Sequence, residues 1–60
     1  MKYLFGNKVK VLKEGFYNGA VGVVVEHELK LGKEHVYGVH FGSDKTLELK
    51  KFKEEELENC

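Results

Sequence analysis

Short runs of alternating polar and apolar residues, separated by glycine-containing turns, are the feature that most limits how this chain folds. Such runs cover residues 8–11, 35–41 and 46–52, and a further run at residues 20–25, AVGVVV, does not alternate but is dense in β-branched residues. Alternation with a period of two places one set of side chains on each face of a strand, and β-branched residues favour that pleated surface. Strands about ten residues apart, with turns marked by glycine, predict a small all-β barrel.

The same alternation predicts which side chains form the core. We expect the inner face to carry Val9, Val11, Val24, Val39, Leu47 and Leu49. Residues 53–58, with the sequence KEEELE, favour one or two turns of helix instead of a strand. Gly22 interrupts an otherwise strong strand, where glycine normally weakens pairing, so we expect a bulge or a bend at that position.

The size and composition of the chain narrow the classes of protein to which it can belong. A chain of 60 residues forms a single domain and cannot make two lobes that close on a substrate. Its 42% of hydrophobic residues suffices for one small core. No run approaches the roughly 20 apolar residues of a membrane span, and Cys60 has no second cysteine to pair with. These features predict a cytoplasmic domain, 1–60, with no disulfide and no membrane partner.

The net charge of zero conceals an uneven distribution of charge. All ten basic residues are lysines, and residues 1–53 contain all of them together with only six acidic residues. The other four acidic residues lie within 54–58. We therefore expect a basic body with an acidic terminus. Arginine is absent, so no guanidinium group can make bidentate hydrogen bonds to guanine edges or phosphates. Base-specific recognition of nucleic acid is therefore not expected.

The spacing of glycines, valines and aromatic residues is similar to that of a known family. The first half of the chain reads Gly6-x-x-Val9-x-Val11, Gly15-Phe16 and Gly19-x-x-Gly22-x-Val24. The second half contains Val39-His40-Phe41-Gly42, Thr46-Leu47-Glu48-Leu49, Phe52 and Glu56-Leu57-Glu58. The first set resembles the KOW motif of NusG-type transcription factors and of several ribosomal proteins, with one extra residue before Gly15. The second set resembles the closing half of the NusG carboxy-terminal domain. The resemblance implies an SH3-like five-stranded barrel with a short C-terminal helical turn.

The resemblance also implies a protein-docking site. The NusG carboxy-terminal domain docks on a small-subunit ribosomal protein and on the termination factor Rho, through the loop after its first strand and the loop between its third and fourth strands. Carried onto this chain, the docking residues are Phe16, Tyr17, Asn18, Phe41, Gly42 and Ser43. Two adjacent aromatic residues in an extended loop cannot both face inward, so we expect either Phe16 or Tyr17 to be exposed as an anchor.

This pattern favours a non-enzymatic module that docks on a protein of the transcription or translation machinery. A stand-alone barrel of this size also suits a phage or bacterial regulator that modulates a host component. The alternative is a weak, sequence-nonspecific RNA- or DNA-binding KOW protein. In that case Lys8, Lys10 and Lys13 would line one surface, with Phe16 and Tyr17 offering faces on which bases stack.

Catalysis and metal binding have less support in the sequence. No Ser or Cys is placed as a nucleophile beside the histidines, which are His27, His35 and His40. Glu26 and Glu28 share one strand face while His27 points to the other, so these residues cannot converge on a metal with His35 or His40 unless a bulge intervenes. Plasmid-type dihydrofolate reductases are also lone SH3-like barrels, but their Gln and Tyr pattern is replaced here by Leu47-Glu48-Leu49-Lys50. We expect no catalytic residue, metal site, cofactor or small-molecule substrate.

Overall fold

The computed structural model of the chain describes residues 2–42 and 48–60. In these residues five strands form one antiparallel sheet in the spatial order β4-β3-β2-β1-β5. The elements are β1 (Lys8–Val11), β2 (Val21–Lys30), β3 (Glu34–Phe41), β4 (Glu48–Lys53), the 3₁₀ turn η1 (Glu54–Glu56) and β5 (Leu57–Asn59). The prediction of an all-β fold is confirmed. Within the described residues β4 and β5 are the two edges and are not paired with each other, so the sheet is not closed.

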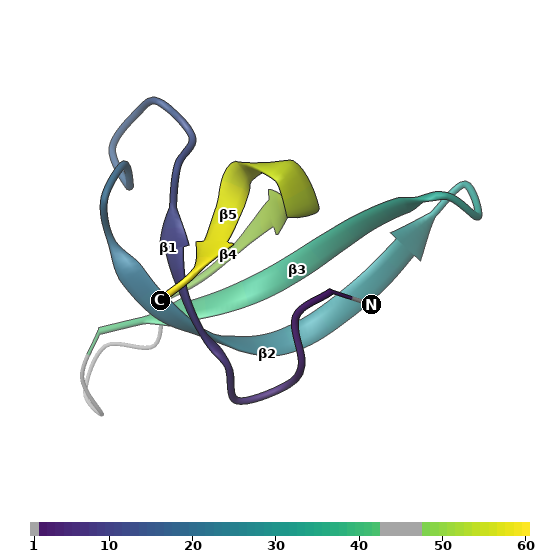
Figure 1. Ribbon diagram of the computed structural model, residues 1–60, viewed down its shortest axis with the longest axis horizontal. Coiled ribbons are helices and arrows are strands. Elements are labelled where there is room, and N and C mark those ends of the chain that lie inside the picture. Colours follow the sequence, from purple (N-terminus) through teal and green to yellow (C-terminus); the bar gives the residue numbers. More distant parts are fainter. Residues whose placement is uncertain (1, 43–47) are drawn as a thin grey trace.

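β2 and β3 form a long curved hairpin whose tip extends away from the other strands (Figure 1). Their pairing runs from Val23 opposite His40 to Lys30 opposite Glu34. The strand predicted at residues 20–25 therefore continues to Lys30, although its second half lacks an apolar alternation. No helix within 2–42 and 48–60 is long and apolar enough to span a membrane.

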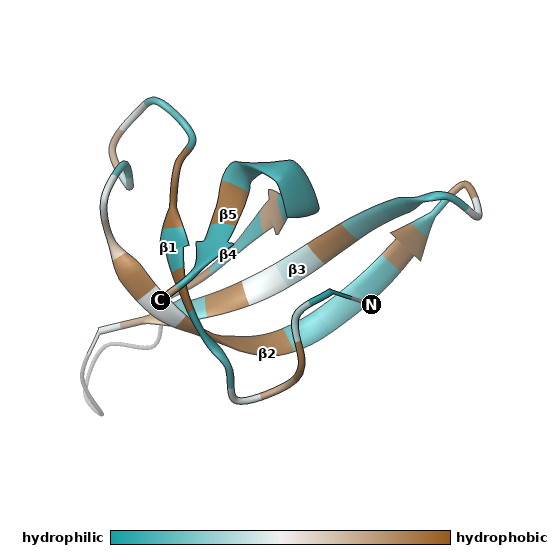
Figure 2. Ribbon diagram, in the orientation of Figure 1, coloured by the Kyte–Doolittle hydropathy of each residue, from teal (hydrophilic) through white to brown (hydrophobic). Residues whose placement is uncertain are grey.

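The hydrophobic core lies where β1 meets the inner halves of β2 and β3. Its members are Tyr3, Val9, Val11, Val24, Tyr37, Val39, Phe41, Phe52 and Leu57. Figure 2 shows the hydrophobic segments of β1, β2 and β3 gathered in this region. Of the predicted core, Val9, Val11, Val24 and Val39 are buried as expected, whereas Leu47 lies outside the described residues.

The predicted burial of Leu49 is wrong. Its side chain is 44% exposed, and it pairs with His40 on the outer face of the sheet. The β4 residue that enters the core is Phe52, which is paired with Tyr37. Because the side-chain period of a strand is two, burial of Phe52 turns Lys50, and not Leu49, toward the inner face.

β2 has a bulge, but it is not at Gly22. Gly22 pairs regularly with Val9, and the register shifts further along the strand, between Val24 and Glu26. Glycine is needed at position 22 for another reason. A Cβ there would lie 2.5 Å from Cγ1 of Val39, closer than packed atoms allow.

The helical turn predicted over residues 53–58 is confirmed only for Glu54–Glu56. The following residues form β5, which pairs with β1 and places Leu57 opposite Val11. Leu57 is 3% exposed, and its backbone oxygen accepts a hydrogen bond from the Tyr3 hydroxyl at 2.9 Å. Burial of the Leu57 side chain stabilises the fold more than a longer, solvent-exposed helical turn would. The end of the chain therefore returns to the sheet.

Candidate functional site

The loop between β1 and β2, residues 12–20, is held by its own hydrogen bonds. The side-chain nitrogen of Asn18 donates to the backbone oxygen of Leu12 at 3.1 Å. The backbone nitrogen of Gly19 donates to the oxygen of Val11 at 2.8 Å, and Gly19 has a φ of 84°, a conformation that glycine adopts without strain. The loop therefore presents its remaining side chains in a fixed arrangement.

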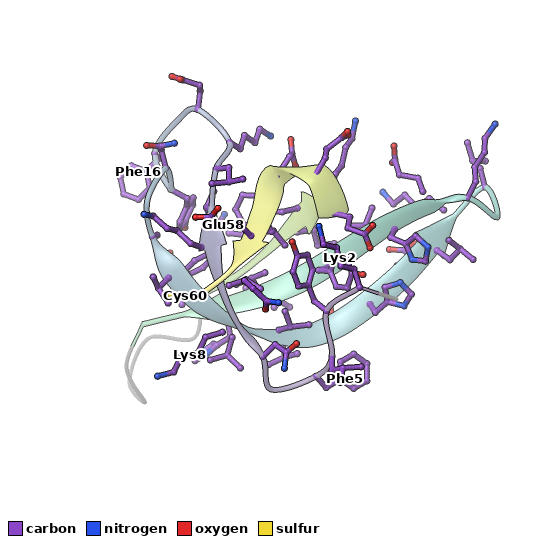
Figure 3. All side chains as sticks on the ribbon, viewed as in Figure 1. Lys2, Phe5, Lys8, Phe16, Glu58 and Cys60 are labelled. Atoms are coloured by element: carbon purple, nitrogen blue, oxygen red, sulfur yellow. The ribbon has the colours of Figure 1, made fainter. Side chains whose placement is uncertain are left out.

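Phe16 is the most prominent side chain of this loop. It is 93% exposed and points away from the strands (Figure 3). Its only aromatic neighbour among the described residues is Tyr17, in an edge-to-face contact with ring centroids 5.1 Å apart. A phenylalanine in this position leaves most of its apolar surface in water, which is an unusual cost for a small domain.

Tyr17 is held in place by contacts to its ring and to its hydroxyl. Its ring packs on Phe41, with centroids 4.9 Å apart, and more distantly on Phe52, at 6.1 Å. Its hydroxyl donates a hydrogen bond to the Glu48 carboxylate. This hydrogen bond, with smaller effects of desolvation and of the Glu48 charge, raises the pKa of Tyr17. The phenol therefore stays protonated, and Tyr17 forms a fixed platform beside Phe16.

A shallow hollow of about 160 Å³ opens next to these two aromatic rings. It is lined by Lys13, Glu14, Gly15, Phe16, Tyr17 and Phe52. Three of its lining residues are aromatic, and the lining also contains one positive and one negative side chain. A hollow of this size fits a single side chain of a partner and is too small for most cofactors.

The structure brings the two predicted loops together through the contact between Tyr17 and Phe41. Phe41 is only 7% exposed, so it supports Tyr17 and does not itself form a surface. Asn18 uses its side chain within its own loop. Gly42 is exposed, with a φ of 94°, and Ser43 lies outside the described residues.

Two residues that contribute to this site, Phe52 and Glu48, were not among the predicted site residues. Phe52 lines the hollow, and Glu48 accepts the hydrogen bond from Tyr17. Both belong to β4, which is distant in sequence from the β1–β2 loop. The only signal for either residue was its place in the resemblance to the closing half of the NusG domain, which assigned no docking role to Glu48 or Phe52.

The predicted lysine surface is interrupted by acidic residues. Lys8 and Lys10 point outward from β1, and Lys10 lies opposite Glu58 in the pairing of β1 with β5. The ammonium of Lys13 lies 3.8 Å from the Glu56 carboxylate. The acidic terminus is therefore not a separate end, because β5 returns it to the lysine-bearing strand. Lys8 and Phe16 lie toward opposite ends of β1 (Figure 3).

A second hollow, of about 360 Å³, lies on the outer face of the sheet. It is lined by Phe5, Val25, Glu26, His27, Glu28, Val36, Gly38 and Lys51. Phe5 is 65% exposed at its edge, and Lys51 and Glu28 form an ion pair of 3.5 Å across it. The bulge at Val25 shapes this surface, and no periodicity in the sequence marks its position.

Comparisons of the chain with models of protein families, with curated proteins and with solved structures found no match.

Proposed function

We propose that the chain is a small non-enzymatic module that docks on a protein partner through Phe16 and the hollow beside it. The observation that carries this proposal is the exposure of Phe16, 93%, on a loop held by internal hydrogen bonds. Aromatic side chains on rigid loops anchor protein interfaces, because they bury a large apolar area and lose little conformational freedom. Complete burial of Phe16 by a partner would contribute up to about 3 kcal/mol.

We further propose that the chain forms an SH3-like barrel of the KOW and NusG type. The five strands, and the short η1 turn before the last of them, agree with what the resemblance implies. On this basis the partner is a protein of the transcription or translation machinery in the cytoplasm. A phage or bacterial regulator that modulates a host component is the kind of protein that suits such a module.

The distribution of charge favours a protein partner over nucleic acid. Of the three lysines considered for nucleic-acid binding, only Lys13 lines the hollow beside Phe16. Lys13 is close to Glu56, and Lys10 is opposite Glu58. Carboxylates beside these lysines repel phosphate, so the attraction that would drive nonspecific binding to nucleic acid is weakened.

Affinity capture from a bacterial lysate, followed by mass spectrometry, tests the proposal. We expect the wild-type chain to retain one main protein, and Phe16→Ala to lose it while the protein stays folded. Leu31→Ala is the matched control, because Leu31 is also 93% exposed but lies at the tip of the β2–β3 hairpin. Substituting an exposed side chain changes stability by only about 0.5 kcal/mol, so the two variants should unfold alike.

Equal retention of the partner by wild type and Phe16→Ala would overturn the docking surface. A second measurement, the binding of a labelled RNA or DNA oligonucleotide at low salt, tests the alternative function, which is nonspecific binding of nucleic acid. The alternative gains support if the oligonucleotide binds, if binding falls steeply with salt, and if Lys8→Gln with Lys10→Gln abolishes it. We expect no such binding.

A further inference from the structure

A pair of histidines lies on the β2–β3 hairpin, away from the proposed docking surface. Nε2 of His27 and Nδ1 of His35 are 2.8 Å apart, and the two ring centroids are 5.0 Å apart. His27 is paired with Tyr37, and His35 with Leu29, so the histidines are diagonal neighbours on one face of two hydrogen-bonded strands. Diagonal neighbours are within reach of long or aromatic side chains.

The bulge in β2 is what brings these rings to the same face. Val24 faces the core, and strict alternation from Val24 would point His27 to the opposite face. The extra residue, Val25, reverses the alternation, and the ring of His27 then packs against Tyr37 at a centroid distance of 5.1 Å. The strand pairing and this aromatic contact limit how far the His27 ring can move.

We infer that His27 and His35 form a binding site for a divalent transition-metal ion such as Zn²⁺, which prefers imidazole nitrogen as a ligand. Zinc–nitrogen distances are about 2.0–2.1 Å, so two nitrogens on one tetrahedral ion lie about 3.3 Å apart and their ring centroids about 5 Å apart. The centroids already have this separation. Small rotations that move the two nitrogens apart by about 0.5 Å therefore suffice to admit the ion.

The protonation of the rings is compatible with metal binding. In the metal-free pair, one of the two facing nitrogens carries the proton of the hydrogen bond. To bind the ion, that ring moves its proton to its other nitrogen, and both rings remain neutral ligands. Glu54 lies with His35 along one hollow of the surface, and its negative charge favours a cation nearby.

The site is open on its solvent side. Within 2–42 and 48–60, no three His, Cys, Asp or Glu residues are grouped so that they could hold an ion. The two histidines therefore supply two coordination positions, and water supplies the others. The hollow that His35 shares with Glu54, of about 210 Å³, is also lined by Lys33, Glu34, Lys53 and Glu55. Two protein ligands give a weaker site than the four of a structural zinc centre.

Titration of the protein with Zn²⁺ alone, followed by NMR of the imidazole protons, tests the inference. The titration uses a Cys60→Ser background, because Cys60 is an exposed free thiol and thiolates bind zinc. We expect the resonances of His27 and His35 to shift together, while those of His40 stay in place. His27→Gln and His35→Gln should each weaken binding at least about tenfold, since even outer-shell changes have such effects. His40→Gln is the matched control, and Mg²⁺, which prefers oxygen ligands, should cause no shift.

The inference is overturned if Zn²⁺ leaves both resonances unchanged, or if either Gln variant binds as tightly as the background protein. It is also overturned if His40→Gln weakens binding equally. Backbone amide spectra report whether each variant is folded. Should a Gln variant fail to fold, the shifts in the background protein still decide the outcome, because they identify which rings meet the ion.

Discussion

The hydroxyl of Tyr37 joins three parts of the chain at one atom. It accepts a hydrogen bond from the backbone nitrogen of Lys2 at 2.9 Å and a longer one from Tyr3 at 3.4 Å. It donates to the Glu54 carboxylate at 2.7 Å. Burial, followed by the hydrogen bond to Glu54, raises the pKa of Tyr37. The same hydrogen bond is the main cause that lowers the pKa of Glu54.

Tyr37→Phe should lower the free energy of unfolding at neutral pH by about 1–3 kcal/mol, because it leaves the buried backbone nitrogen of Tyr3 and the partly buried Glu54 carboxylate without this partner. The difference should be pH-dependent. A carboxyl whose pKa is lowered in the folded state stabilises the fold above its unfolded pKa, and this contribution is lost as the pH falls through the folded value. Urea unfolding at neutral pH and near pH 3 measures the change. A difference between wild type and Tyr37→Phe that stays constant with pH would contradict the role of Glu54.

At the scale of elements, the conformation of β5 depends on its partner strand. The sequence of residues 53–58 favours helix, yet Leu57–Asn59 pairs with β1. Local propensity is a weak preference that burial overrides. Leu57 provides that burial, at 3% exposure.

Leu57→Ala should destabilise the protein by about 2–5 kcal/mol, the range for a buried leucine truncated to alanine. For a domain of 60 residues this is a large part of the total stability. Glu58→Ala, at the adjacent exposed position, serves as the control and should change stability by about 0.5 kcal/mol or less. If urea unfolding gives similar values for the two variants, β5 is not part of the cooperative fold.

The packing of β2 against β3 leaves no room for a side chain at Gly22. An added Cβ would approach both Cγ1 of Val39, at 2.5 Å, and the backbone oxygen of His40, at 2.7 Å. A backbone atom cannot move aside without disturbing the strand pairing. Gly22→Ala should therefore destabilise the protein by about 1–3 kcal/mol, whereas Val21→Ala, at an exposed neighbour, should cost less. Thermal unfolding of the two variants compares them, and an increase in stability for Gly22→Ala would refute this account.

At the scale of the whole molecule, opposite charges are interspersed. The ion pairs found in the described residues join Lys13 to Glu56, Lys51 to Glu28 and Lys53 to Glu34. In each pair the lysine is more than half exposed to solvent, where such pairs contribute about 0–1 kcal/mol. The local excess of lysine in residues 1–53 is offset in part by η1 and β5, since Glu56 pairs with Lys13 and Glu58 lies opposite Lys10.

Salt should therefore have a small effect on stability. Raising sodium chloride from low concentration to about 0.5 M should change the free energy of unfolding by less than about 1 kcal/mol. A lysine-rich body that repelled itself would instead be stabilised markedly by salt. Chemical unfolding at the two salt concentrations distinguishes these cases.

The candidate site could be predicted only in part. The adjacent Phe16 and Tyr17 indicate one exposed aromatic residue, but the choice between them depends on Phe41 and Phe52, which lie far away in the sequence. Tyr17 packs on both rings, and Phe16 is left in solvent. The histidine pair depends in the same way on pairing between strands.

The sequence located four of the five strands and four of the nine core residues, because period-two alternation is a local property that each strand carries alone. It places Val9, Val11, Val24 and Val39 correctly. The face of β4, the bulge at Val25 and the return of β5 to β1 depend instead on contacts between distant segments. These features depend on which side chains meet across strands, where burial of Phe52 and Leu57 outweighs the local preferences of their own segments.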